Sequence, residues 1–274
     1  MTIAFATLNS RALVRVAGPD WRDLLQGLLT NDVEHLAEGQ IRFAALLTPQ
    51  GRVLFDMFVI GGADGCLLDV AAERRDALIQ RLLIYRLRAK AEIAAAEGQV
   101  CALWGAAAAP EGWVADPRLP ALGWRAVGQA APPGARILEE ADYNGLRLDV
   151  GAPDPERDCV PDKTYPIEAD FDLLNGIDFK KGCFVGQETT SRMKRRGGIR
   201  SRMLPIEFDG PPPAFGAEIL AGSLRAGEAL SGRDGRAMAL LRLDRIGEGP
   251  LTVEGRPARA VFPGWLGRPD ETEA

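Results

Sequence analysis

The chain has 274 residues, of which 46% are hydrophobic, and its formal net charge is −5. The length suits two domains, and the acidic balance gives no general reason to expect a nucleic-acid partner. Four widely spaced cysteines and one histidine argue against a zinc ribbon or a multi-histidine metal site, so we expect no resident metal. No signal-like run and no stretch near the ~20 apolar residues of a membrane helix occurs, so we expect a cytoplasmic protein without a membrane partner.

The first hundred residues alternate between patterns typical of strands and of helices. Apolar residues with period two indicate strands, and apolar residues three and four apart indicate helices. In chain order, the predicted elements are a strand at 10–17, a helix from Trp21 to about Asn31, the two strands of a β-hairpin at 41–47 and 53–60, a strand at 66–70, an amphipathic helix at 73–88 and a strand within 93–104.

The rest of the chain is richer in turns. Residues 105–135 contain much Ala, Pro and Gly and predict loops around short strands, and 144–150 alternates like a strand. Short apolar runs from Met203 onward predict a small antiparallel barrel. We therefore divide the chain into a first domain at 1–202, a barrel at 203–266 and a tail at 267–274.

The most informative segment is Lys180-Lys-Gly-Cys-Phe-Val-Gly-Gln-Glu188, in which a thiol lies between two glycines. Glycines allow tight turns and the close approach of a ligand. Nearby cations such as Lys181 favour the thiolate, the form of cysteine that attacks electrophiles and binds metals. A buried, inert cysteine is the alternative. We predict that Cys183 is a functional thiol.

Two carboxylates are candidates for binding a heterocycle. Asp56 interrupts the apolar strand 53–60, so it lies either on the wet face of that strand or in a pocket, where it can hydrogen-bond a bound ring. Glu168 follows Pro166 in a restrained turn. A ring with an N–C–NH₂ edge donates two parallel hydrogen bonds to one carboxylate, which makes Glu168 or Asp170 an anchor for a pterin. Exposure to solvent is the alternative for both.

Polar residues after the thiol have two interpretations each. Gln187 and Glu188 can hydrogen-bond a ligand, or they can cap a helix that begins at residue 185 or 186. The basic run 192–202, which includes Arg202, is either a solvated face or a site that attracts an anionic folate tail or an acidic protein.

The segment 181–188 resembles the signature of the YgfZ family, folate-binding proteins related to the glycine-cleavage T-protein aminomethyltransferases. The likeness extends over most of the chain. Its other parts are Gly18-Pro-Asp20, Leu24-Leu-Gln-Gly-Leu-Leu-Thr-Asn-Asp-Val33, Leu47-Thr-Pro-Gln-Gly-Arg-Val-Leu-Phe-Asp56, Pro166-Ile-Glu168 and Gly198-Ile-Arg-Ser-Arg-Met-Leu204.

This resemblance implies an α+β fold, with an aminomethyltransferase-like folate-binding core of several subdomains around a central pocket and a small C-terminal antiparallel β-barrel. It implies binding of tetrahydrofolate or a derivative, and a role in assembling or repairing iron–sulfur clusters of client enzymes. Cys183 would be the family's characteristic thiol, and Asp56 would lie at or next to the catalytic aspartate of the transferases. The residues we assign to cofactor binding are Glu168, Asp56, Lys181, Gln187 and Arg202.

Three functions follow from these observations. The first is a folate-dependent accessory factor for iron–sulfur client or assembly proteins, without multiple turnover. The second is a one-carbon (aminomethyl) transferase. Aminomethyltransferases commonly carry two adjacent acids in this hairpin, whereas Phe55 precedes Asp56 here, which counts against it. The third is a scaffold that uses the fold without folate.

Overall fold

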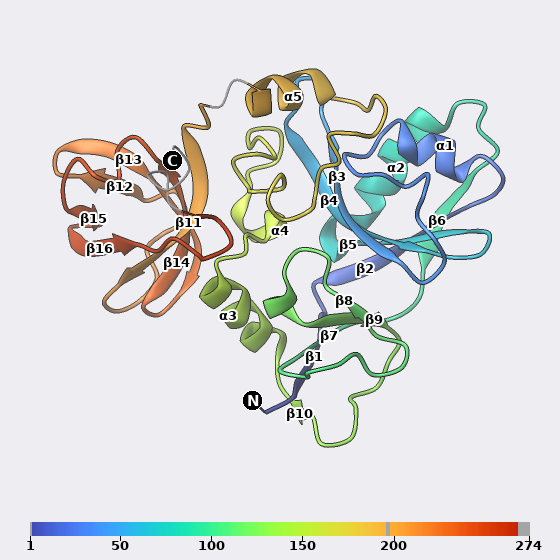
Figure 1. The fold of residues 1–274 in the computed structure, drawn as a ribbon, viewed down its shortest axis with the longest axis horizontal. Coiled ribbons are helices and arrows are strands. Elements are labelled where there is room, and N and C mark those ends of the chain that lie inside the picture. The colour runs from blue at the N-terminus through green and yellow to red at the C-terminus, as the bar shows by residue number, and fades with distance from the viewer. Residues whose placement is uncertain (1, 196–197, 268–274) are drawn as a thin grey trace.

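The computed structural model describes residues 2–195 and 198–267. Figure 1 shows two open sheets in the larger part of the molecule and, at one end, a barrel formed by the last strands of the chain. The arrangement agrees with the predicted core followed by a small barrel. Of the predicted tail at 267–274, only Gly267 is described, and Arg196 and Gly197 of the basic run also lie outside the described residues.

The first sheet is antiparallel, with the strand order β3-β4-β5-β2-β6. Apolar side chains alternate along its strands, so one face packs against two helices and forms the largest core cluster. The elements, which follow the predicted pattern closely, are β2 (Arg11–Ala17), α1 (Trp21–Gln26), β3 (Ile41–Leu47), β4 (Val53–Gly61), β5 (Gly65–Ala71), the 3-10 turn η1 (Ala72–Arg74), α2 (Arg75–Arg86) and β6 (Glu92–Ala96).

Helix α1 is shorter than the sequence predicts. It ends at Gln26, and the apolar residues that follow it belong to a buried loop. The hydroxyl of Thr30 donates to the carbonyl oxygen of Gly176 at 2.6 Å and accepts from the N–H of Ala45 at 2.8 Å. These long-range bonds compensate the backbone groups that a longer helix would have paired internally.

The second sheet has the strand order β10-β1-β7-β9-β8 and contains the turn-rich region of the sequence. The predicted strand within 93–104 is divided between the two sheets, because it contains β6 and β7. The members of this part are β1 (Ala4–Thr7), β7 (Val100–Trp104), β8 (Val114–Ala115), the 3-10 turn η2 (Pro120–Leu122), β9 (Trp124–Val127) and β10 (Arg136–Ile137).

The predicted strand at 144–150 is wrong, because these residues belong to helix α3 (Glu140–Val150). A capping box between Glu139 and Asp142 starts the helix, and Gly151 ends it in the left-handed conformation. These end signals outweigh the alternating pattern of the sequence. The short helix α4 (Pro155–Asp158) follows.

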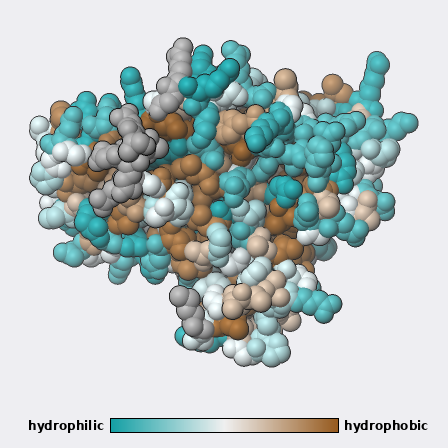
Figure 2. Space-filling model, in the orientation of Figure 1, coloured by the Kyte–Doolittle hydropathy of each residue, from teal (hydrophilic) through white to brown (hydrophobic). Residues whose placement is uncertain are grey.

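The C-terminal strands close into a six-stranded antiparallel barrel. Figure 2 shows apolar side chains gathered where the barrel meets the rest of the molecule. There, the guanidinium of Arg147 contacts both Asp158 and Ser231. The division of the chain into domains at 202 stays a prediction. The barrel strands are β11 (Ser201–Phe208), β12 (Glu218–Ala221), β13 (Leu224–Arg233), β14 (Arg236–Arg242), β15 (Leu251–Val253) and β16 (Arg256–Ala260).

Candidate functional site

Cys183 is exposed, whereas the other three cysteines of the chain, Cys66, Cys101 and Cys159, are buried. Burial raises the pKa of Cys66 to about 12, and it raises the pKa of Cys159 well above its ordinary value. Neither of these groups ionises readily near neutral pH. Cys183 is therefore the thiol that a partner molecule can reach.

The segment 178–186, which we term the thiol loop, is attached at both ends to the loop that follows α1. The N–H of Asp178 donates to the carbonyl oxygen of Thr30 at 3.0 Å, and the N–H of Val185 donates to that of Gly27 at 3.2 Å. The thiol loop is thus held by residues that lie far away in the sequence.

Lys181 fixes the middle of the thiol loop. Its Nζ donates to the carbonyl oxygens of Gln26 at 2.9 Å, Leu29 at 2.6 Å and Asn31 at 2.7 Å. An ammonium group has three N–H donors, so these bonds leave none for the neighbouring thiol. Burial lowers the pKa of Lys181 to about 8. This geometry gives Lys181 a positioning role, and its assignment to a cofactor stays a prediction.

The two glycines beside Cys183 differ in their surroundings. Gly186 has φ +81°, and a Cβ at this position would lie 2.6 Å from the carbonyl oxygen of Thr48 and 2.9 Å from the Cα of Gly51. At Gly182, no described atom lies within 4 Å of the corresponding point. Gly186 therefore allows the thiol loop to pack against the β3–β4 turn, while Gly182 leaves open space on the solvent side.

Helix α5 (Gln187–Arg195) begins directly after Gly186. The predicted start at 185 or 186 is slightly early, because the positive φ of Gly186 is incompatible with a helix. Glu188 is exposed in the first turn, where a negative charge is favourable. Gln187 is half-buried, and its N–H donates to the carbonyl oxygen of Phe184 at 3.2 Å. A ligand-binding role for Gln187 stays a prediction.

Asp56 lies inside the core, with 6% of its surface exposed. Its Oδ2 accepts a hydrogen bond from Nη1 of Arg11 at 3.3 Å. Burial raises the pKa of Asp56, and the positive charge of Arg11 opposes this shift. Asp56 therefore does not lie on a wet strand face, and the alternative, a carboxylate that lines a ligand pocket, stays a prediction.

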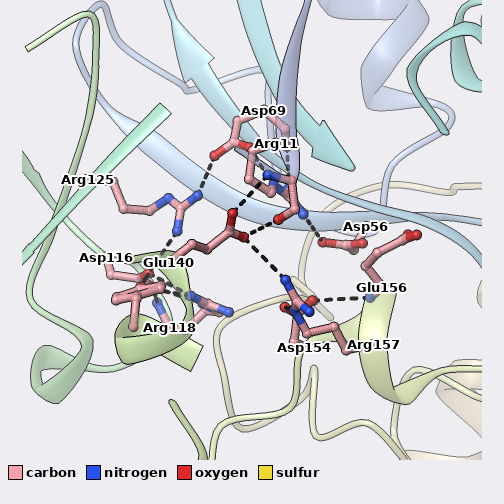
Figure 3. A network of polar contacts seen from close by, with 12 residues as sticks. Arg11, Asp56, Asp69, Asp116, Arg118, Arg125, Glu140, Asp154, Glu156 and Arg157 are labelled. Carbon is pink, nitrogen blue, oxygen red and sulfur yellow. Dashed lines mark hydrogen bonds and ion pairs between the residues drawn. The ribbon is translucent and has the colours of Figure 1, made fainter. Parts of the chain in front are cut away.

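Buried arginines and carboxylates surround Asp56 in a network that we term the central ion cluster, formed by Arg11, Asp56, Asp69, Asp116, Arg118 and Arg125. Asp69 joins two of the arginines, because its carboxylate accepts from Arg11 at 2.7 Å and from Arg125 at 2.5 Å. Figure 3 shows these contacts together with Glu140, which pairs with Arg157 at 3.3 Å. Each buried charge therefore has a partner of opposite sign.

Little space remains beside Asp56. A cavity of about 30 Å³ is lined by Asp56, Arg118 and Arg147, among others, and a second cavity of about 20 Å³ lies between Asp56 and Cys159. Such volumes suit a water molecule, whereas small-molecule pockets take ~300–1,000 Å³. Neither of these two cavities has room for a folate in this conformation.

Glu168 does not line either cavity beside Asp56. Its Oε2 accepts a hydrogen bond from the N–H of Tyr165 at 2.9 Å, which closes a local turn. Burial raises the pKa of Glu168, while this hydrogen bond and the charge of Arg52 oppose the shift. The two acids assigned to one folate thus lie in different surroundings, and the role of Glu168 as a pterin anchor stays a prediction.

Arg202 is buried at the start of the barrel and is occupied by carboxylates. Its Nη1 lies 2.7 Å from Asp170 and 2.9 Å from Asp172, and its Nη2 lies 3.0 Å from Asp172. The pKa of Asp170 is raised to about 8 by burial, despite the opposing charge of Arg202. In this structure Arg202 ties strand β11 to residues 170–172, and cofactor binding by it stays a prediction.

Sequence reasoning missed the central ion cluster apart from Asp56. A signal was present in Asp69, a single charge inside the apolar strand 65–71, which is the same pattern that drew attention to Asp56. The arginine partners could not be assigned this way, because Arg118 and Arg125 come from a turn-rich region without a regular pattern.

Similarity to curated proteins identifies the family. The mitochondrial iron–sulfur cluster assembly factor IBA57 of Mus musculus is 32% identical over an alignment that covers 94% of this chain and 84% of that protein. The chain belongs to the IBA57 family of iron–sulfur cluster assembly factors. The Homo sapiens IBA57 protein is also 32% identical, with 93% of this chain and 81% of the relative covered. Both relatives are named as mitochondrial, so the predicted cytoplasmic location is not confirmed.

Two further comparisons concern the fold of this IBA57 family member. Residues 200–268 match the family described as CAF17, C-terminal beta-barrel domain. The crystal structure of the glycine cleavage system aminomethyltransferase T from Bartonella henselae has a TM-score of 0.76 at 19% identity, covering 97% of this chain and 87% of that chain. The predicted aminomethyltransferase-like fold with a C-terminal barrel is confirmed. Within 2–195 and 198–267, no helix has the length and apolar character needed to cross a bilayer.

Proposed function

We propose that this IBA57 family member matures iron–sulfur clusters in client enzymes through direct contact of Cys183 with a cluster or with the protein that carries it. The observation that supports this is the exposure of Cys183, while the other three thiols are buried. In the proposed contact, the thiol releases its proton to solvent, and the thiolate sulfur donates an electron pair to an iron of the cluster in exchange for a ligand that leaves that iron. The cluster is cargo in this scheme, and the chain itself undergoes no redox change.

The fixed backbone around the thiol supports this role. Lys181 and Gly186 restrain the thiol loop on both sides of Cys183, while open space lies beside Gly182. A pre-positioned ligand loses less conformational entropy when it binds, so a rigid loop favours a brief, specific contact. The resemblance of this segment to the YgfZ signature belongs to the same proposal.

The test is activation of a client enzyme that needs an iron–sulfur cluster, in a strain that lacks the endogenous factor. The wild-type chain should restore client activity, and Cys183→Ala should not. Cys66→Ala is the matched control, since it removes a thiol that is buried. Full restoration by Cys183→Ala would refute the thiol role, and circular dichroism should show that both variants are folded.

Binding of tetrahydrofolate or a derivative is the second part of the proposal, and a folate beside Asp56 would require the two small cavities there to widen. Equilibrium binding of tetrahydrofolate under anaerobic conditions tests it directly. If a pterin enters beside Asp56 and Glu168, both Asp56→Asn and Glu168→Gln should weaken saturable binding. No saturable binding by the wild-type chain would favour the scaffold function without folate. Formation of methylene-tetrahydrofolate over multiple turnovers would instead indicate the aminomethyl transferase.

A further inference from the structure

A groove starts beside α1, the end of α2 and β6, and it continues over the face of the first sheet that is opposite the two helices. It consists of three neighbouring hollows that share lining residues, and we term it the sheet groove. The largest hollow has about 820 Å³ and shares Arg15 with a hollow of about 220 Å³. That hollow shares Ile60 and Leu67 with a third of about 150 Å³. The three hollows are therefore neighbours, and Cys183 lines none of them.

Strand pairing sets the length and direction of the sheet groove. Ile41 pairs with Ile60, Ile60 pairs with Leu67, and Leu67 pairs with Arg15. Directly paired residues point to the same face, so these four side chains form a row across the strands. Three strand spacings separate its ends, which is about 14 Å at ~4.8 Å per spacing. An extended peptide spans that distance with about four residues.

One end of the sheet groove is basic. Arg15, Arg22, Arg86 and Lys90 line the largest hollow, against the two acids Asp64 and Glu92. Figure 1 shows why they meet, since α1, the end of α2 and β6 lie together at this end of the molecule. Of the described residues, no carboxylate forms an ion pair with Arg15, Arg86 or Lys90. In a chain of net charge −5, this is a local excess of available positive charge.

The other end of the sheet groove is apolar and small. Its walls come from both open sheets and are mainly apolar, with Ile41, Ile60, Leu67, Val114 and Val127. Two charged residues of the central ion cluster, Asp69 and Arg125, also line it. An apolar cavity of about 150 Å³ accommodates a six-membered ring, so this hollow matches one large apolar side chain. A discrete hollow of that size fits a single anchoring side chain better than it fits a flat lipid surface.

We propose that the sheet groove binds an extended segment of a partner protein that carries acidic residues at one end and one bulky apolar side chain at the other. The acidic residues lie among Arg15, Arg86 and Lys90, and the apolar side chain fills the hollow beside Val114. Charge complementarity selects the partner, and the apolar anchor fixes its register. This inference does not depend on the chemistry of Cys183.

Fluorescence polarisation with two labelled probe peptides tests this proposal. Each peptide carries a run of Glu and Asp residues, a Gly/Ser spacer of about four residues and a Phe, in opposite orders, because the groove does not fix the chain direction. We expect saturable binding by one of them, weakened about tenfold or more between low and high salt. Replacing its Phe by Ser, or its acids by Lys, should weaken binding by a similar factor.

Variants of the full chain separate the two ends of the groove. The double variant Arg15→Glu, Lys90→Glu should weaken binding of the acidic peptide about tenfold or more, and Val114→Phe should do the same by filling the apolar hollow. Arg136→Glu is the matched control, since Arg136 is exposed on β10 and does not line the groove.

Several results would overturn the proposal. These are the absence of saturable binding by both peptides, equal affinity for the groove variants and wild type, or an equal loss in Arg136→Glu. A different outcome is that wild type binds neither peptide but sediments with phosphatidylserine vesicles, and that the double variant Arg15→Glu, Lys90→Glu does not sediment. That result would assign the groove to a membrane surface instead. Unchanged thermal unfolding of each variant should accompany the binding data.

Discussion

The Nζ of Lys181 lies 2.6 Å from the carbonyl oxygen of Leu29, although 152 positions separate the two residues. Two more carbonyl oxygens, those of Gln26 and Asn31, complete its hydrogen bonds. Lys181 of the thiol motif thus donates its hydrogen bonds to the backbone of a loop that is distant in the sequence. This contact sets the position of Cys183 relative to the core.

Replacing Lys181 should destabilise the chain. Lys181→Met leaves three carbonyl groups without their donor, which should lower the free energy of unfolding by about 2–4 kcal/mol. Urea unfolding followed by circular dichroism measures this change. Lys180→Met is the control, because Lys180 is exposed, and it should change stability by no more than about 0.5 kcal/mol. Equal effects of the two substitutions would contradict the positioning role.

The two glycines of the motif should respond differently to alanine. Gly186→Ala places a Cβ within 2.6 Å of the carbonyl oxygen of Thr48 and requires a left-handed backbone, so it should lower the free energy of unfolding by about 1–3 kcal/mol. Gly182→Ala meets open space and should be tolerated. Thermal unfolding of the two variants compares them directly. A well-tolerated Gly186→Ala would show that the loop packs differently.

Thiol titration should distinguish Cys183 from the other cysteines. In the native protein, a colourless aromatic disulfide reagent should react rapidly with one thiol of the four, because three are buried. Cys183→Ser should remove this rapid phase, and denaturant should expose the remaining three thiols. A rapid phase that persists in Cys183→Ser would mean that another cysteine is accessible.

Removing Asp69 should be costly, because it joins Arg11 and Arg125 inside the core. Asp69→Asn removes the negative charge that two buried guanidinium groups share, so the free energy of unfolding should fall by about 3–5 kcal/mol. The comparison is Glu218→Gln in the barrel, where Glu218 lies 3.6 Å from Arg225 in an exposed pair and contributes below about 1 kcal/mol. Chemical denaturation of both variants provides the measurement.

Asp170 should make stability depend on pH. Its pKa is about 8 in the folded chain, above its ordinary value of 3.8, so the folded state binds a proton that the unfolded state releases. The contribution of this group to stability is therefore full below about pH 4 and declines as pH rises toward 8. Unfolding free energies across this range should show the decline in wild type, and Asp170→Asn should reduce it. An unchanged slope in Asp170→Asn would assign the dependence to other groups.

Local patterns predicted much of the fold. The hairpin strands at 41–47 and 53–60 and the helix at 73–88 follow from periodicity, which depends on residues a few positions apart. The prediction of a strand at 144–150 was wrong because the capping box before these residues and Gly151 after them favour a helix, although apolar and polar residues alternate between them. Cys183 and Asp56 were found because each differs in chemistry from its neighbours: Cys183 is a thiol between two glycines, and Asp56 is a carboxylate in an apolar strand.

The sequence alone determined most strands and helices between residues 10 and 104, the barrel after residue 202 and the position of the thiol motif, because each depends on short-range spacing. Only the tertiary structure decided that Cys183 is exposed, that Lys181 bonds to the loop after α1, and that Asp56 is buried beside Arg11. Hydrogen bonds and ion pairs of this kind join residues that are distant along the chain, so no local pattern specifies their partners.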